Sequence, residues 1–345
     1  MKPKRRIIPV FIPHQGCRHD CVFCNQHRIS GAADPSSAFD VSRVISEFTN
    51  CGDTVTPVEL AFYGGSFTAI PERAQIGLLE AAQPLLALNP LNSLRISTRP
   101  DNIDSAIIAR LKEYGVSTIE LGVQSMRDDV LFSSHRGHTA NDARQAAILV
   151  KYSGVSLILQ MMTGLPGDSP DGALLTARQF IDMNPDGVRI YPTVVICGTQ
   201  LYEMWKRGEY KEHSIEEAVA LCSRLVPMFE NARIPVIRLG LNPSEELSAG
   251  GVAAGAYHPA FGELVYSRLY YEKAASMLGR VKPGSDIIIA VPKGRGSRMI
   301  GANRQNIVKL TSDFSLRSVK VIESETVSDM EIRRLSIRPT INILK

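Results

Sequence analysis

The run Gly16-Cys17-Arg18-His19-Asp20-Cys21-Val22-Phe23-Cys24 carries three cysteines in C-x3-C-x2-C spacing. Thiolates this close together can hold three irons of a four-iron cluster, which leaves the fourth iron without a protein ligand. A closed cluster or a structural zinc site needs a fourth ligand, because such a site is built to be inert. The run therefore predicts an open iron site, at which chemistry can occur, held by Cys17, Cys21 and Cys24.

Two other uses of these cysteines have to be weighed. His14, His19 or His27 could complete a zinc site. A disulfide framework fits less well, because the chain of 345 residues contains only 6 cysteines. The other three are scattered, at Cys51, Cys197 and Cys222.

The beginning of the chain does not resemble an export signal. Residues 1–6 are basic, but the apolar run at 7–13 is too short for a signal core and is interrupted by proline. No stretch approaches the roughly 20 apolar residues of a membrane span. We expect a soluble, reduced, cytoplasmic protein.

The charge is unevenly distributed along the chain. The formal net charge is +4, but residues 280–345 contain 13 Lys and Arg against 6 Asp and Glu, a balance of +7. The first 279 residues therefore carry −3. A basic excess confined to the last fifth suggests an appended module that contacts polyanions.

Short apolar, β-branched runs alternate with helical patterns up to about residue 240. The expected strands are 7–12, 58–63, 94–98, 118–123, 156–161 and 188–195, with a seventh candidate at 235–239. The expected helices are 41–50, 72–88, 104–114, 141–153, 171–183 and 214–232, with Asp104 and Ser214 as N-caps. This alternation predicts an α/β fold with a parallel sheet, built as a partial (β/α)6-type barrel.

The conspicuous polar and glycine clusters all follow predicted strands. They are the cysteine run, Tyr63-Gly64-Gly65-Ser66-Phe67-Thr68, Arg99-Pro100-Asp101, Gln124-Ser125 and Thr163-Gly164-Leu165-Pro166-Gly167. Parallel barrels carry their active groups on the loops after the carboxyl ends of the strands. We therefore expect these clusters to share one site.

The pattern changes after residue 240. We expect a barrel domain at 1–240, a linker and helix at 241–279, and a small basic α+β module at 280–345. Residues 242–263 suggest a long connection, 266–278 a helix, 286–291 a strand, 292–299 a loop, 304–310 a helix and 318–323 a strand.

The cysteine run after the first strand, followed by Gly64-Gly65 after the second, resembles the radical SAM superfamily. The resemblance implies a [4Fe-4S] cluster whose free iron is chelated by S-adenosylmethionine (SAM). It further implies that an electron, from a donor such as ferredoxin or flavodoxin, cleaves SAM to a 5′-deoxyadenosyl radical. Glycine suits this position because backbone without a side chain can approach a ligand closely.

The resemblance extends over residues 6–240 to the Elongator catalytic-subunit branch of that superfamily. Glu120-Leu121-Gly122-Val123-Gln124-Ser125 and Arg136-Gly137-His138-Thr139 resemble a segment that this branch shares with the oxygen-independent coproporphyrinogen dehydrogenases. The stretches that resemble the Elongator branch specifically are Arg99-Pro100-Asp101, Ile190-Tyr191-Pro192-Thr193-Val194-Val195-Ile196, Gly198-Thr199, Leu201-Tyr202 and Trp205-Lys206-Arg207-Gly208-Glu209-Tyr210-Lys211. We do not expect the acetyltransferase domain of that family, because the remaining residues are few and their closest match to its CoA loop fails at Asn303.

The resemblance also assigns cofactor-binding positions. They are Gly64, Gly65, Ser66, Arg99, Gln124, Arg136 and Gln160. Arg136 would pair with the SAM carboxylate as a guanidinium fork can, and Gln160 would lie near the adenosyl ribose. Ser97 stands where the branch has a glutamate, so ribose binding would fall to Gln160. Tyr63, His138 and Cys197 are candidates for a catalytic role.

The C-terminal module contains the stretch Met299-Ile300-Gly301-Ala302-Asn303-Arg304-Gln305-Asn306-Ile307, which resembles the core of a KH domain. In KH domains a Gly-x-x-Gly loop between two short helices clamps single-stranded nucleic acid. Here Arg304 replaces the second glycine. The RNA-binding candidates are Lys293, Arg295, Arg298, Gly301, Arg304 and Lys309. The alternative is a small solvated capping domain.

These observations predict a radical SAM enzyme that acts on RNA, with a tRNA base as the candidate target. One alternative keeps the chemistry and changes the substrate to a small molecule or tetrapyrrole. Another, supported by Ser97, is a cluster-containing RNA-binding protein without turnover.

Overall fold

The structure is a computed structural model that describes residues 6–12, 17, 19–25, 41, 58–87, 91–243, 247–279 and 281–334. The chain divides into two compact units, Met1–Pro259 and Ala260–Lys345. No helix within the described ranges is long and apolar enough to cross a membrane.

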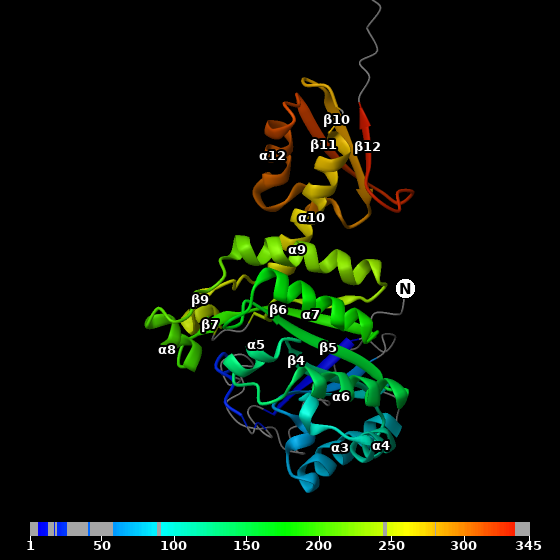
Figure 1. The fold of residues 1–345 in the computed structure, drawn as a ribbon. Coiled ribbons are helices and arrows are strands. Elements are labelled where there is room, and N and C mark those ends of the chain that lie inside the picture. Colours follow the sequence, from blue (N-terminus) through cyan, green and yellow to red (C-terminus); the bar gives the residue numbers. More distant parts are fainter. Residues whose placement is uncertain are drawn as a thin grey trace, which may run out of the picture. The chain divides into compact units, whose positions relative to one another are not determined.

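The first unit is built on a curled parallel sheet of seven described strands (Figure 1). They are β1 (Arg6–Ile12), β2 (Val58–Gly64), β3 (Ser93–Thr98), β4 (Val116–Gln124), β5 (Ser156–Thr163), β6 (Gly187–Pro192) and β8 (Val236–Leu239). They follow one another across the sheet in chain order. This confirms the predicted partial barrel, and the seventh candidate strand takes its place as β8.

Helices between the strands cover the outer face of the sheet (Figure 1). They are α3 (Glu72–Ala87), α4 (Ser105–Glu113), α6 (Ala140–Tyr152), α7 (Pro170–Asp182) and α9 (Ile215–Asn231). Two short helices, α5 (Asp128–Ser133) and α8 (Gln200–Lys206), lie in the connections that follow β4 and β6. Asp104 caps α4 by accepting a hydrogen bond from the Ile107 amide, and Ser214 forms a capping box with Glu217, as the sequence predicts. Of the helix expected at 41–50, only Val41 is described.

Three parts of the first unit differ from expectation. The strand expected at 188–195 is interrupted at Thr193, and β7 (Val194–Ile196) leaves the main sheet to pair antiparallel with β9 (Val252–Gly255). The connection expected over 242–263 is therefore wrong where it contains β9. Helices α5 and α8 escape prediction because they are short, with 6 and 7 residues.

The second unit is a three-stranded sheet with helices. Strand β10 (Asp286–Pro292) lies between β11 (Ser318–Ser324), which is parallel, and β12 (Glu331–Arg334), which is antiparallel. The helices are α10 (Phe261–Leu278), α11 (Gly296–Ile300) and α12 (Gln305–Asp313). The loop expected over 292–299 is wrong in its second half, which forms α11. The core contains Ile287, Ile289, Val291, Met299 and Leu310.

Candidate cofactor site

A cavity of about 310 Å³ lies at the carboxyl ends of β2, β3 and β4 and beside β5. All three cysteines of the triplet line it. So do all seven residues assigned to cofactor binding, together with Ser97, namely Gly64, Gly65, Ser66, Arg99, Gln124, Arg136 and Gln160. The structure thus brings together residues that are up to 143 positions apart in the chain.

The loop that carries the three cysteines, here called the cysteine loop (described at residues 17 and 19–25), is held by backbone contacts around Val22. The Val22 amide donates to the Ser134 carbonyl at 3.3 Å, and the Val22 carbonyl accepts from the Leu201 amide at 2.7 Å. Val22 is buried with Leu201 in one apolar cluster. The loop is therefore fixed between the end of α5 and the start of α8, two elements that sequence reasoning missed.

Gly64 has a structural reason to be glycine besides ligand approach. Its φ is +109°, and a Cβ there would lie 3.1 Å from the backbone of Ile12. The next amide, Gly65, donates to the Ile12 carbonyl at 3.0 Å. A side chain at position 64 would thus force β1 away from β2, and with it the start of the cysteine loop.

Gln124 and Arg136 have hydrogen-bonding capacity to spare inside the cavity. Gln124 has a left-handed backbone, φ 73°, where the pairing of β4 with β5 shifts register. Its side-chain Oε1 is buried and has no partner among the described residues. The Arg136 Nη1 donates to the Cys21 Sγ at 3.1 Å, whereas its buried Nε has no described partner. Unmet acceptors and donors beside the three cysteines fit a polar, charged cofactor.

The Arg99 guanidinium has less hydrogen-bonding capacity left for a ligand than the side chains of Gln124 and Arg136. Its guanidinium donates to both carboxylate oxygens of Asp101, at 2.9 and 3.1 Å, and to the Arg136 backbone carbonyl. Ser66 is also engaged, since its hydroxyl bonds the Thr98 hydroxyl at 2.9 Å and accepts from the Arg99 amide at 3.2 Å. These two residues line the cavity but principally hold its wall in place.

A buried charged cluster lies on the inner face of the sheet, and sequence reasoning missed it. Glu120 is fully buried and accepts hydrogen bonds from four strands. The donors are Arg95 Nη1 at 2.5 Å, Arg189 Nη2 at 2.7 Å, Gln160 Nε2 at 3.0 Å and Tyr63 OH at 3.1 Å. Arg95 also pairs with Glu59, so two carboxylates balance two guanidinium groups.

None of the three catalytic candidates lines the cavity. Tyr63 belongs to the buried cluster, where burial and Glu120 raise the pKa of its hydroxyl. Cys197 lies against the Gly250 carbonyl, with its Sγ 3.7 Å from that oxygen. His138 is 5% exposed, and its Nε2 lies 3.2 Å from the Val123 carbonyl. Burial, Arg136 and Arg99 lower the pKa of His138 to about 4, so this imidazole is neutral near pH 7.

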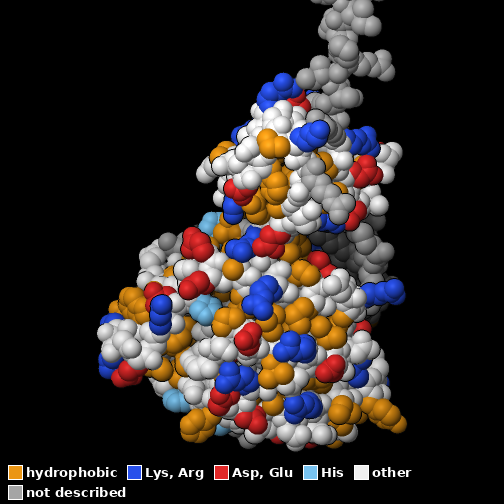
Figure 2. All heavy atoms as spheres, turned by 45° about the horizontal axis from the view of Figure 1, so that its top comes forward, with side chains coloured by type: hydrophobic (Ala, Val, Ile, Leu, Met, Phe, Trp, Pro, Cys, Tyr) orange, Lys and Arg blue, Asp and Glu red, His pale blue; other side chains and the backbone are white. Residues whose placement is uncertain are grey.

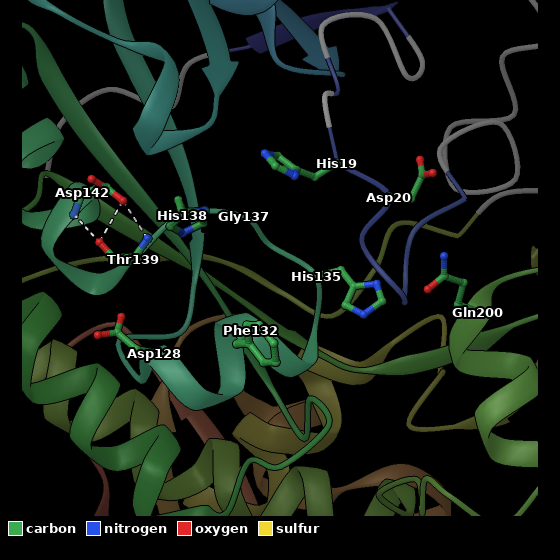
Figure 3. A pocket seen from close by; sticks show the side chains of 10 residues that line it. All are labelled: His19, Asp20, Asp128, Phe132, His135, Gly137, His138, Thr139, Asp142 and Gln200. Atoms are coloured by element: carbon green, nitrogen blue, oxygen red, sulfur yellow. Dashed lines mark hydrogen bonds between the residues drawn. The ribbon is translucent and has the colours of Figure 1, made fainter.

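His138 instead lines a second, wider pocket that shares His19, Asp20 and Gln200 with the first. Figure 3 shows His138, Thr139 and Asp142 on one side of this pocket and Gln200 on the other. The ring of His19 occupies the space that a Cβ at Gly137 would need, at 2.4 Å. Glycine at position 137 thus lets the cysteine loop pack closely against the segment after α5.

The arrangement of ligand groups bears on the zinc alternative. No three Cys, His, Asp or Glu side chains of the described ranges lie together closely enough to hold one metal ion. His14 and His27 lie outside those ranges. A four-iron cluster takes one thiolate per iron, so its three thiolates need not converge on a single point. Cys17, Cys21 and Cys24 around one cavity fit that requirement.

The second unit presents the predicted loop at the junction of α11 and α12. Gly301, Asn303 and Arg304 all have positive φ, of 75°, 50° and 60°. Arg304 therefore has the left-handed backbone that the second glycine of the resembled motif would favour. Asn306 is buried and donates to the Ser267 carbonyl at 2.8 Å, which ties the loop to α10.

The basic side chains predicted to bind RNA differ in how far they are already engaged by other side chains of this unit. Arg298 pairs with Glu263 at 2.8 Å and lies over the Tyr266 ring, while Lys293 pairs with Glu325 at 2.6 Å. Lys309 lies over the Tyr271 ring. On the face shown in Figure 2, positive and negative side chains of this unit are interspersed. Arg304 has no ion-pair partner within the described ranges.

Comparison with known proteins identifies the architecture. Residues 11–179 match the model of the Radical SAM superfamily, and residues 185–271 match that of the Radical SAM C-terminal domain. Among solved structures, the archaeal Methanocaldococcus infernus Elp3 with an N-terminal deletion is similar, with a TM-score of 0.61 and 26% identity. That similarity covers 80% of this chain and 64% of the archaeal one.

Two curated relatives show the same similarity in sequence. The Methanocaldococcus jannaschii protein named tRNA uridine(34) acetyltransferase is 32% identical over 249 residues, which are 66% of this chain and 45% of the relative. Mouse Elongator complex protein 3 is 29% identical over 248 residues, which are 65% of this chain and 44% of the relative. The chain thus spans less than half the length of these relatives.

The two matched models together cover residues 11–271 except for a short gap, and the similar structure has the same architecture. The superfamily uses a [4Fe-4S] cluster and SAM, and the donor set of the cavity fits both. The chain belongs to the radical SAM superfamily of enzymes, and it resembles the Elongator branch.

Proposed function

We propose that this radical SAM enzyme holds a [4Fe-4S] cluster on Cys17, Cys21 and Cys24 and uses SAM to modify RNA, with tRNA as the substrate class. The observation that carries the chemical part is the single cavity shared by the three cysteines, Gln124 and Arg136. The names of the similar proteins, a tRNA acetyltransferase and an Elongator subunit, support the choice of RNA.

When bound, the cluster and SAM would supply reductive cleavage of SAM to a 5′-deoxyadenosyl radical. The residues of this chain would bind and orient the two groups. Arg136, whose Nη1 already donates to the Cys21 sulfur, would link the cluster side of the cavity to the SAM carboxylate. Gln124 would offer its unpaired Oε1 to a donor on the ligand. A ferredoxin or flavodoxin would supply the electron.

The second unit would contribute by binding the RNA backbone. Its Gly301–Arg304 loop, with three positive φ values, can bring backbone amides close to phosphate, and Arg304 adds a free guanidinium. Arg298 and Lys293 are already paired with acidic side chains. We therefore assign the main phosphate contact to Arg304, and Arg295 and Lys309 would extend it.

Two measurements test the two parts. Anaerobically reconstituted protein with a reductant should convert SAM to 5′-deoxyadenosine and methionine; failure to do so would contradict the radical chemistry and favour a binding protein without turnover. Filter retention of a tRNA transcript should weaken steeply as salt rises from 50 to about 200 mM. SAM cleavage without tRNA retention would redirect the search to a small-molecule substrate.

A further inference from the structure

Arg238 is an inner-face arginine of the barrel that has no acidic partner within the described ranges. The register of β6 and β8 pairs it with Arg189, so the two side chains lie on the same face of the sheet. Arg189 belongs to the buried network, in which two carboxylates already balance two guanidinium groups. Arg238 therefore adds a third guanidinium and a surplus positive charge to this face.

The Arg238 side chain runs along β8 toward the carboxyl end of the sheet. Its Nε donates to the carbonyl of Gly240, two residues further along the chain, at 3.0 Å. The Gly240 amide donates to the Ile190 carbonyl at 2.9 Å, which fixes Gly240 beside the end of β6. Tyr191 is the next residue on β6, and its side chain faces the same way as that of Arg189, two positions earlier. The Arg238 guanidinium therefore lies close to the Tyr191 side chain.

The Tyr191 hydroxyl has a proton to donate on this face. Its oxygen accepts from the Arg189 Nη1 at 3.2 Å. A guanidinium cannot accept a hydrogen bond, so the hydroxyl proton needs another acceptor, and the described ranges provide none. Nor does any described group accept from the Arg238 Nη1 and Nη2 atoms. Both side chains are only half-buried, so a ligand can reach these donors.

The charge around these donors selects the kind of ligand. Burial and the nearby Arg189 lower the pKa of Arg238, which shows that its positive charge is disfavoured at this place. An anion would offset the repulsion between the two guanidinium groups, whereas a neutral ligand would not. Phosphate suits these donors, because its oxygens can accept from a guanidinium fork and from a hydroxyl at the same time.

We propose that Tyr191 and Arg238 bind a phosphate group of the substrate on the inner face of the barrel. This site rests on the proposed function, in which the substrate is RNA; the phosphate is then that of the backbone beside the target nucleotide. Neither residue lines the cofactor cavity, but Gln160, which does, is the register partner of Arg189. The phosphate site thus lies two strand spacings, about 10 Å, from the cavity wall. An anchor at that distance leaves the cavity to the cofactor and holds the nucleotide beside it.

Binding of a mononucleotide tests the site without turnover. Cluster-loaded protein is titrated anaerobically by calorimetry with uridine and with uridine 5′-monophosphate. The wild type should bind the nucleotide about 10-fold more tightly than the nucleoside, the effect of one hydrogen bond to a charged group. Arg238→Gln should bring this ratio close to 1, and Tyr191→Phe, which removes only the hydroxyl, should lower it to about 3. Arg238→Lys keeps the charge without the fork and should also retain a ratio of about 3.

Two comparisons serve as controls. Arg224→Gln removes an exposed charge from the outer helix α9 and should leave the ratio unchanged. Glycerol phosphate, a phosphorylated small molecule, should bind the wild type more weakly than the nucleotide, because it has no base or ribose to pack against the barrel. The ratio compares two ligands on one variant, so a general loss of stability does not change it.

Several outcomes would overturn the phosphate site. A wild type that binds nucleotide and nucleoside equally, or binds neither, does so, as does an undiminished ratio in Arg238→Gln. Loss of the ratio in Arg304→Ala but not in Arg238→Gln would move the phosphate to the second unit. Glycerol phosphate bound as tightly as the nucleotide would overturn the choice of RNA as the source of the phosphate.

These results are distinguishable from a failure of the proposed function. Absence of SAM cleavage, which is measured separately, contradicts the radical chemistry and does not alter the ratio of the two dissociation constants. SAM cleavage with a ratio of 1 in the wild type overturns the phosphate site alone. Should Arg238→Gln fail to fold by circular dichroism, Tyr191→Phe decides, and an undiminished ratio in that variant overturns the site.

Discussion

The inner face of the barrel and the loop of the second unit both depend on charged side chains, but in opposite ways. Glu59, Arg95 and Glu120 are buried in a balanced network that joins several strands. Arg304 and Lys293 are exposed to solvent, and Lys293 forms an ion pair with the exposed Glu325. Removing a partner from a buried network leaves a charge that water cannot reach, whereas an exposed pair is worth little. The first region is thus built for fixed geometry and the second for reversible contact.

Losing a cysteine should have the largest effect and should leave the second region untouched. Cys21→Ala removes one of three cluster ligands, so we expect no intact [4Fe-4S] cluster by iron content and electron paramagnetic resonance. Retention of tRNA should persist. Cys197→Ala, which removes a thiol that does not line the cavity, is the matched control and should load normally. A full cluster in Cys21→Ala would overturn the ligand assignment.

Breaking the buried network should cost the first unit much of its stability. Arg95→Met keeps the length of the side chain but leaves Glu59 and Glu120 without their shared cation, so we expect a loss of about 3–5 kcal/mol in the free energy of unfolding. Urea titration followed by circular dichroism measures it. Arg207→Met removes an exposed partner of Glu209 and should leave the unfolding midpoint unchanged. Equal effects from the two changes would show that burial does not distinguish these pairs.

Acid should weaken the first unit through His138. Its folded-state pKa of about 4 lies below the ordinary 6.5, so between these values the unfolded chain holds a proton that the folded chain does not. The free energy of unfolding should therefore fall as the pH drops from 6.5 to 4, by up to about 3 kcal/mol. Urea titrations at several pH values compare the wild type with His138→Gln, which should lack this part of the slope. Parallel slopes would contradict a buried neutral imidazole.

Substitutions in the second unit should give the smallest changes. Arg304 should affect tRNA retention, and Arg298 should affect thermal stability. Arg304→Ala should weaken tRNA retention a few-fold and lower the salt slope by about 1, as expected for one lost phosphate contact. Arg298→Ala should chiefly lower the melting temperature, because Arg298 pairs with Glu263 and covers Tyr266. Arg333→Ala, on β12, controls for net charge. If Arg298→Ala weakens retention more than Arg304→Ala does, the loop assignment is wrong.

The same contrast explains what the sequence could and could not reveal. The strands, the caps at Asp104 and Ser214, and the shared location of the polar clusters follow from local patterns and from the rule that parallel strands end on one side. The charged network does not, because Glu59, Arg95 and Arg189 come from three separate strands and their pairing depends on register. Nor does the left-handed backbone of Gln124, which arises from a register shift between β4 and β5.

The resemblance to the radical SAM superfamily also predicted only part of the site. It identified which residues gather around the cavity, but not how each is engaged. Arg99 and Ser66 were expected to contact the cofactor, and the structure shows both bonded within the protein. Position in a motif indicates where a side chain lies; the hydrogen bonds left over after folding indicate what it can still bind.

The attachment of α8 to the cysteine loop has one more consequence. Trp205 is the only tryptophan of the chain, and it lies on α8 within the apolar cluster that contains Val22. Its Nε1 donates to Glu212 at 2.8 Å and its ring stacks on Tyr202. The protein therefore carries a built-in optical reporter beside the loop that would receive iron and sulfide. Quenching of its fluorescence would follow cluster assembly in real time, without a label.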